Sequence, residues 1–232
     1  MEKKLSARLS VIAELIPAGS LAADVGTDHA LLPIHLIRSG RTARVIASDN
    51  KAAPLEKARR AVQAAGLSQQ IDLRLGDGLS VLAPEEADCI VLAGMGGETI
   101  ADILAAAPWC ADGTHRLLLQ PMSKAELLRG ALARLGLAAE KECLVRDGGS
   151  LYCVLAVRGC DGPYDLAPVE QYLSPALAAS GDPLLAEYLE KLLRRLERAR
   201  VGAARSGRES DRERARELTE VLTALYQRRE ML

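Results

Sequence analysis

Three acidic residues in the first half of the sequence each stand at the end of a short apolar segment. These residues are Asp24, Asp49 and Asp77. Short apolar segments of this kind are typical of buried strands. Because the carboxyl ends of parallel strands meet at one edge of a sheet, the three carboxylates are expected to converge on one crevice. Each Asp alone also fits a turn or a helix cap, but the repetition after three consecutive segments favours a ligand site.

The loops around these carboxylates indicate the class of ligand. Asp49, followed by Asn50, is placed to accept hydrogen bonds from both hydroxyls of a ribose, and Asp77-Gly78 is placed to reach an adenine amino group. Gly26 has no Cβ, so the first loop can turn tightly and approach a ligand. The full Gly-x-Gly-x-x-Gly pattern that seats the pyrophosphate of a dinucleotide is absent. A phosphate-free methyl donor, S-adenosylmethionine, tolerates such a loop.

A second glycine-rich run follows the fourth apolar segment. It reads Gly94-Met95-Gly96-Gly97, and Gln120-Pro121 follows the fifth segment at the same predicted edge. Glycines here allow close backbone approach, either to the methionine part of the donor or to an inserted base. The alternative is a mobile loop that caps the next helix. Gln120 is a candidate to hydrogen-bond the edge of a base.

The elements that must position these residues alternate along the chain. Apolar segments predict seven strands, and 3.6-residue periodicity predicts five helices that largely alternate with them. The expected fold is therefore an α/β sheet, mostly parallel with an antiparallel hairpin of strands at its end. Such a terminal hairpin resembles the Rossmann-like sheet of class I methyltransferases. The predicted strands are 21–25, 44–48, 71–75, 89–93, 115–119, 139–145 and 151–157. The predicted helices are 5–16, 30–39, one from Pro54 to the closing Gly66, 98–107 and 123–135.

The remainder of the chain has a different character. Residues 1–160 form the expected Rossmann-like methyltransferase domain, and the Pro- and Gly-rich stretch 161–182 is interpreted as a linker that wraps it. In residues 183–232, two apolar stripes at helical spacing predict an antiparallel helical hairpin or coiled coil. Two interpretations of this hairpin stay open, a dimerisation or packing element and an arm that grips RNA.

Composition excludes several classes of protein. The net charge of −1 divides into +3 for residues 184–232 and −4 for residues 1–183. No apolar run reaches the roughly 18 residues of a membrane span, and the start of the chain lacks the pattern of a signal peptide. The five cysteines form no Cys-x-x-Cys pair, which favours reduced thiols over disulfides or zinc. A cytoplasmic protein without metal, as a monomer or weak homodimer, is expected.

At this point the motifs become specific. The run Asp24-Val25-Gly26-Thr27-Asp28-His29-Ala30-Leu31-Leu32-Pro33, together with residues 94–97 and 120–121, resembles the bacterial tRNA (adenine(22)-N1)-methyltransferase family. Residues 5–9 and 172–175 also resemble segments of that family. The family pattern usually has Ser at position 27 and Tyr at position 31. The resemblance implies S-adenosylmethionine as cofactor, tRNA as partner, a helical C-terminal domain, and methylation of N1 of a D-arm adenine.

Roles for individual residues follow from this resemblance. Asp28 is the candidate catalytic residue, with a carboxylate that favours the positive charge gained by the methylated base. The expected cofactor ligands are the acidic residues and glycines of the strand ends, with Asn50: Asp24, Gly26, Asp49, Asn50, Asp77, Gly78 and Gly94. The expected tRNA contacts combine the rim with basic residues of the first helix: His29, Met95, Gly96, Gly97, Gln120, Pro121, Lys4 and Arg8.

Two other functions are weighed against this one. A nicotinamide oxidoreductase shares the sheet, but the sequence lacks the glycines that bind its cofactor and offers no evident site of hydride transfer. A non-catalytic module that binds S-adenosylmethionine or RNA is the stronger alternative. His29 has two interpretations, a structural one and a functional one, and a His beside a loop Asp is more often structural.

Overall fold

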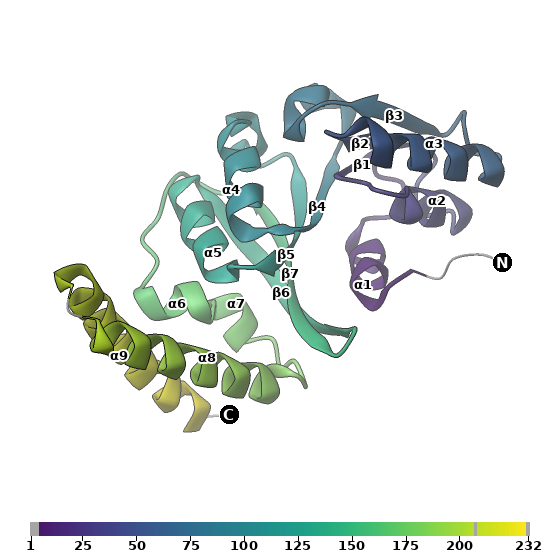
Figure 1. Cartoon of the computed structure of the whole chain (residues 1–232). Coiled ribbons are helices and arrows are strands. Elements are labelled where there is room, and N and C mark those ends of the chain that lie inside the picture. The colour runs from purple at the N-terminus through teal and green to yellow at the C-terminus, as the bar shows by residue number, and fades with distance from the viewer. Residues whose placement is uncertain (1–4, 207, 231–232) are drawn as a thin grey trace. The chain divides into compact units, whose positions relative to one another are not determined.

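The computed structural model describes residues 5–206 and 208–230. The chain divides into two compact units, Met1–Asp165 and Leu166–Leu232 (Figure 1). Within the described ranges, no helix combines the length and the apolar character that a membrane crossing requires. Lys4, which the sequence proposes as a phosphate contact, lies outside the described residues.

The first unit is built on one sheet of seven strands in the order β3-β2-β1-β4-β5-β7-β6. β1 to β5 run parallel to one another, and β7 runs antiparallel to both β5 and β6. This topology confirms the predicted Rossmann-like sheet with a terminal antiparallel hairpin. The strands are β1 Ala22–Val25, β2 Val45–Asp49, β3 Ile71–Leu75, β4 Cys89–Gly96, β5 Arg116–Ser123, β6 Leu137–Asp147 and β7 Ser150–Gly159.

Helices cover both faces of this sheet (Figure 1). The helices α1, α2 and α3 pack on one face, where Ile12 and Leu36 join Val91 and Leu118 in a buried cluster. The helices α4 and α5 contact β4, β5 and β6. With no Phe in the chain, the core is aliphatic. The helices of this unit are α1 Ala7–Leu15, α2 Leu31–Arg38, α3 Ala52–Ala65, α4 Gly97–Ala105 and α5 Ala125–Arg134, with short 3-10 turns η1 Gly78–Val81, η2 Pro84–Glu86 and η3 Pro108–Ala111.

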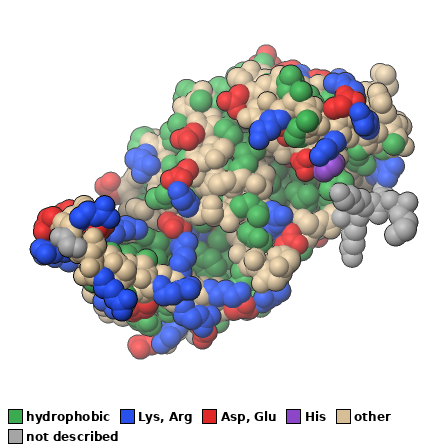
Figure 2. Space-filling model, viewed as in Figure 1, with side chains coloured by type: hydrophobic (Ala, Val, Ile, Leu, Met, Phe, Trp, Pro, Cys, Tyr) green, Lys and Arg blue, Asp and Glu red, His purple; other side chains and the backbone are tan. Residues whose placement is uncertain are grey.

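The secondary-structure elements described in the second unit are all helices. Its elements are α6 Pro168–Tyr172, α7 Pro175–Ala178, α8 Leu185–Arg205 and α9 Glu209–Glu230. The buried faces of α8 and α9 consist of Leu and Val at helical spacing, which confirms the predicted small helical part of the fold. Arg214 of α9 donates a hydrogen bond to the Tyr172 hydroxyl of α6 at 3.1 Å. Figure 2 shows Lys and Arg side chains gathered over these helices.

β4 and β5 continue three and four residues beyond their predicted ends at 93 and 119. Ala93 pairs with Gln120 and Met95 pairs with Pro121, so Gly94 is an extra residue in β4, with a φ of +80°. Such a bulge lets a strand with poor strand formers stay in the sheet. The glycine-rich run is therefore largely strand and not a loop.

The five cysteines differ in burial: Cys89, Cys110 and Cys153 are buried, Cys143 is partly buried and Cys160 is exposed. Cys143 and Cys153 are one register position apart across the hairpin of β6 and β7, because Cys143 lies opposite Val154 and Cys153 opposite Leu144. Burial raises the pKa of the Cys89 and Cys110 thiols to about 12, so both stay protonated at neutral pH.

Candidate active site

A cavity of about 630 Å³ opens at the carboxyl ends of β1, β2, β3 and β4. This is the edge of the sheet where parallel α/β folds bind ligands. The volume lies within the range of ordinary small-molecule sites. Six residues proposed from the sequence as ligand contacts line it: Gly26, Asp49, Asn50, Asp77, Gly78 and Met95.

The acidic residues at the ends of β2 and β3, Asp49 and Asp77, both line this cavity. Asp49 is nearly buried, and its Oδ1 accepts a hydrogen bond from the backbone N–H of Lys51 at 2.9 Å. Asn50 Nδ2 donates to Asp77 Oδ1 at 3.4 Å. These contacts hold the carboxylates at the start of α3 and in the loop after β3. The structure thus places both side chains where a nucleoside can donate hydrogen bonds to them.

Asp24 lies in β1, buried beside the cavity and not in its lining. The pKa of Asp24 is raised to about 6, mainly by burial. A hydrogen bond from Thr27 opposes this rise, and the negative charge of Asp49 adds to it. Thr27 Oγ1 donates to Asp24 Oδ2 at 2.6 Å. Through this hydrogen bond, Asp24 anchors Thr27 and so fixes the loop that follows β1.

The loop after β1 passes very close to β4. A Cβ at Gly26 would lie 2.2 Å from the Cε of Met95, and Gly26 has a φ of +83°. The backbone N–H groups of Gly26 and Thr27 both donate to the carbonyl of Ser48, at 2.8 and 2.9 Å. The left-handed backbone favours glycine here, and a Cβ would also have to displace the flexible end of Met95.

Asp28 and His29 follow directly on this loop, at its solvent side. The Asp28 side chain is 66% exposed, and its Oδ2 lies 3.6 Å from His29 Nε2. Asp28 and Ala30 both have left-handed backbone, with φ of +47° and +53°. Left-handed non-glycine residues cost free energy and are held only by the surrounding structure, often at functional sites. Neither Asp28 nor His29 lines the cavity.

The three glycines of the run in β4 and α4 have different surroundings. Gly94 has no atom near its missing Cβ, so its backbone faces open space. In contrast, a Cβ at Gly97 would lie 2.3 Å from the carbonyl oxygen of Lys124. Gly97 therefore lets the start of α4 pack against the turn between β5 and α5. Gly96 precedes it as the residue that caps α4.

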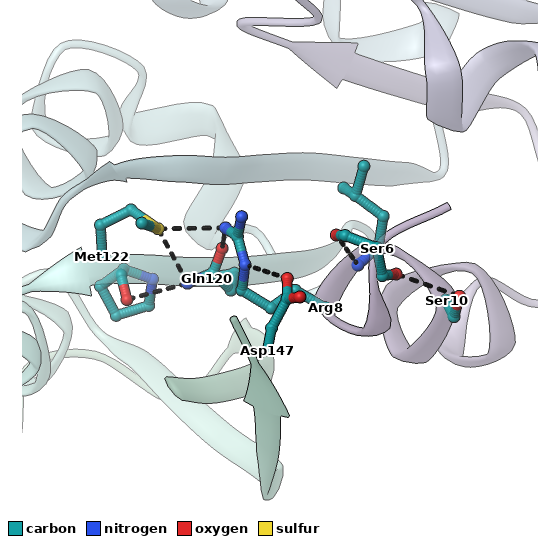
Figure 3. A network of polar contacts seen from close by, with 8 residues as sticks. Ser6, Arg8, Ser10, Gln120, Met122 and Asp147 are labelled. Atoms are coloured by element: carbon teal, nitrogen blue, oxygen red, sulfur yellow. Dashed lines mark hydrogen bonds and ion pairs between the residues drawn. The ribbon is translucent and has the colours of Figure 1, made fainter. Parts of the chain in front are cut away.

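Gln120, Pro121 and Arg8 form a separate polar network beside the cavity (Figure 3). Gln120 is fully buried, and its Nε2 donates to the carbonyl of Pro121 at 3.0 Å. Arg8 Nη1 donates to Gln120 Oε1 at 2.7 Å, and Arg8 Nε donates to Asp147 Oδ2 at 2.8 Å. The structure thus directs the guanidinium of Arg8 inward, toward the end of β5.

Several cavity residues were missed by the sequence analysis because they lie on helices and not at strand ends. Thr99, Asp102, Ile103 and Ala106 line the cavity from α4 and its C-cap. Their spacing of three, four and seven residues is a helical face, and this signal is visible in the sequence. Trp109 of η3 also lines the cavity, although nothing in its local sequence indicates this position.

The described residues contain no group of three or more His, Cys, Asp or Glu side chains arranged to hold a metal ion. The cavity lining combines carboxylates with hydroxyl and amide side chains, the ammonium of Lys51, the indole of Trp109 and apolar side chains. This set suits recognition of a nucleoside.

Comparisons with known proteins define the class and then the family. Residues 5–155 match the family described as a methyltransferase domain, so the fold and the cavity belong to a methyltransferase. The chain is 40% identical over 160 residues to the tRNA (adenine(22)-N(1))-methyltransferase of Bacillus subtilis, covering 69% of this chain and 67% of the relative. The chain belongs to the tRNA (adenine(22)-N1)-methyltransferase family.

Solved structures of relatives superpose over nearly the whole chain. The B. subtilis M1A22 tRNA methyltransferase TrmK matches with a TM-score of 0.86 at 31% identity, over 97% of this chain and 98% of that one. Sp1610 of Streptococcus pneumoniae, solved in complex with S-adenosyl-L-methionine, matches with a TM-score of 0.82 at 29% identity, over 97% and 99% of the two chains. Both units of the chain are therefore shared with these relatives.

Proposed function

We propose that this protein transfers a methyl group from S-adenosylmethionine to N1 of adenine 22 in tRNA. The observation that supports it best is the cavity at the strand ends, with Asp49 and Asp77 in its lining, in a chain that is 40% identical to an enzyme of that name. Because the proposed substrate is tRNA, we expect the reaction to take place in the cytoplasm. The loop after β1 lacks the glycines that seat the pyrophosphate of a nicotinamide cofactor, which argues against an oxidoreductase.

S-adenosylmethionine, when bound, supplies a methyl group activated by its sulfonium sulfur. The cavity fits this cofactor in size and in chemistry. Asp49 accepts hydrogen bonds from the ribose hydroxyls, and Asp77, held by Asn50, faces the adenine amino group. Gly26 and Gly78 both line the cavity, and both have the left-handed backbone that glycine adopts without strain. Asp24 lies buried beside this wall, and the backbone of Gly94 has open space around it.

Asp28 is assigned the catalytic role. N1 of an unprotonated adenine carries a free lone pair, so alignment of the base contributes most to the rate and a strong base is not required. The adenine ring gains positive charge as its N1 is methylated. The exposed carboxylate of Asp28, held by a left-handed backbone two residues after Gly26, accepts a hydrogen bond from the adenine amino group and stabilises that charge. His29, 3.6 Å away, orients the carboxylate.

The rim beside the cavity is assigned to the target base. Met95 lines the cavity and pairs with Pro121 across the bulge of β4. Gly94 and Gly96 flank Met95 and keep the approach open. The base must leave its stack to reach this rim, at a cost of roughly a few kcal/mol.

The helical unit is assigned to the tRNA backbone. Arg198 of α8 and Arg229 of α9 line one groove with Tyr226, and the guanidinium of Arg229 lies 5.1 Å from the centre of the Tyr226 ring. Carboxylates of the same groove are already paired, Glu190 with Arg194 at 3.2 Å and Glu197 with Arg200. This leaves two exposed arginines beside an aromatic ring, a combination that binds phosphates and stacks bases.

The test separates an enzyme from a module that only binds. Methyl transfer from labelled S-adenosylmethionine to unmodified tRNA is measured for the wild-type protein and for Asp28→Asn. We expect 1-methyladenosine from the wild-type protein, and a loss of kcat of about a hundred-fold or more in the variant, with cofactor affinity unchanged. A wild-type protein that binds cofactor and tRNA but transfers no label would instead be a binding module.

A further inference from the structure

The last four residues of β5 lie in an unusual setting. β5 pairs with β7 only as far as Leu119, opposite Leu155, while its pairing with β4 continues to Ser123. Pro121 pairs with Met95 and Ser123 with Gly96, so Met122 is an extra residue with no partner on β4. Bulges of this kind redirect a side chain. The side chain of Met122 accordingly points out of the sheet, and the residue is 41% exposed.

Arg8 of α1 reaches the edge of β5 that β7 no longer covers (Figure 3). Its Nη1 donates to Gln120 Oε1 at 2.7 Å and lies 3.0 Å from the Sδ of Met122. Its guanidinium also lies 5.0 Å from the centre of the Tyr152 ring. One side chain therefore contacts both the buried Gln120 and the exposed Met122 of the strand end, which lie 112 and 114 residues further along the chain.

A fixed carboxylate holds the guanidinium in this position. Asp147 stands at the end of β6, before the tight turn to β7, and its Oδ2 accepts a hydrogen bond from Arg8 Nε at 2.8 Å. Hydrogen bonds from Arg8 and Ser6 keep the pKa of Asp147 below its ordinary value. The carboxylate is thus ionised at neutral pH, and through Arg8 it connects α1, the end of β5 and the hairpin of β6 and β7.

We infer that Arg8 is a positioning residue for the base half of the site, and that Met122 is the apolar side chain it presents to the target adenine. This inference rests on the proposed function. Among the large apolar side chains that are exposed in the described residues, Met122 is the one in β4 or β5. Two aromatic side chains of this unit have other contacts, since Trp109 lines the cavity and the guanidinium of Arg8 lies over the ring of Tyr152. A thioether contacts an aromatic ring favourably.

The geometry distinguishes this role from a phosphate contact. A positioning Arg8 needs a planar fork that bonds Asp147 and Gln120 at once, which the single ammonium of a lysine does not reproduce. A phosphate contact needs only a positive charge. The variant Arg8→Lys is therefore impaired if the residue positions Gln120 and Met122, and nearly active if it contacts the tRNA backbone.

The experiment measures kcat/KM for tRNA as a function of salt, with cofactor affinity and Tm as controls for folding. For Met122→Ala we expect a fall in kcat/KM of about ten-fold, with Met122→Leu close to wild type. For Arg8→Lys and Arg8→Ala we expect a similar fall, with the slope of log kcat/KM against log salt unchanged. The double variant Arg8→Ala with Met122→Ala should be no worse than Arg8→Ala alone, because the two residues act as a unit. Arg60→Ala, an exposed arginine of α3, is the matched control.

Three results would overturn the inference. The first is an active Arg8→Lys, and the second is a slope reduced by about 1 in Arg8→Ala; either one marks a phosphate contact. The third is additive loss in the double variant, which means that Met122 and Arg8 act independently. A wild-type protein that fails to methylate tRNA would instead contradict the proposed function, and the two failures are thereby distinguished.

Discussion

The terminal methyl of Met95 occupies the space into which any side chain at Gly26 would project, with 2.2 Å between the Met95 Cε and a Cβ at Gly26. This contact joins the loop that leads to Asp28 with the strand that borders the cofactor cavity. Because Met95 also lines that cavity, the position of its side chain decides both the shape of the cofactor site and the course of the loop.

A substitution at Gly26 is expected to damage both features. Gly26→Ala places a Cβ at a φ of +83°, which costs roughly 1 kcal/mol of folding free energy, and it pushes the flexible end of Met95 into the cavity. We expect weaker binding of S-adenosylmethionine, measured by calorimetry. Met95→Ala added to Gly26→Ala should recover part of the affinity, since the clash is then removed. Equal affinities in all three proteins would show that the contact has no bearing on the cofactor.

The carboxylate of Asp49 has the clearest role in cofactor binding. Asp49→Asn keeps the shape of the side chain but replaces a charged acceptor, so the dissociation constant of S-adenosylmethionine should rise about ten- to a hundred-fold. Asp161→Asn, at an exposed position outside the cavity, is the matched control and should bind normally. A variant at position 49 with wild-type affinity would remove Asp49 from the ribose site.

Stability should depend on pH through Asp24. Its pKa is about 6 in the folded protein and 3.8 in the unfolded chain, so the neutral form is favoured on folding. This contribution is fully present below pH 3.8 and is lost as pH rises through 6. In Asp24→Asn the side chain stays neutral, so its free energy of unfolding relative to wild type should improve by about 2.5 kcal/mol between pH 4 and pH 7. Urea unfolding of both proteins across this pH range measures the difference in their free energies of unfolding. A difference that does not change with pH would contradict the prediction.

The groove of the helical unit should control the salt dependence of tRNA binding. Arg198→Ala with Arg229→Ala removes two cations from one groove, so the slope of log affinity against log salt should fall in magnitude by about 2. Affinity for S-adenosylmethionine should not change. The matched control is Arg208→Ala with Arg212→Ala, because these arginines are paired with Asp211 and Glu209. Equal slopes for both double variants would leave the groove without a specific role.

Much of the fold was predictable because it depends on local patterns. Apolar segments and helical periodicity located the strands and helices, and the rule that ligands bind at carboxyl ends of parallel strands located Asp49 and Asp77. The ends of β4 and β5 were not predicted, because Gly94, Gly96 and Pro121 are poor strand formers locally and are held by pairing across the bulge.

The finer geometry depends on contacts between distant segments. The burial of Gln120 is set by Arg8, 112 residues away, and the position of Trp109 in the cavity depends on how η3 packs beside α4. Neither relation leaves a periodic pattern in the sequence. Arg8 illustrates the consequence, since the sequence shows only a basic residue of the first helix, whereas the structure shows its contacts with Asp147 and Gln120.

The most direct test of the proposed reaction is the dependence of methyl transfer on one base. Unmodified tRNA with adenine at position 22 is compared with the same tRNA carrying guanine there, using labelled S-adenosylmethionine and analysis of the product nucleosides. The proposal predicts label in 1-methyladenosine with the first tRNA and none with the second. Equal labelling of both, or no labelling of either despite measurable cofactor binding, would contradict it.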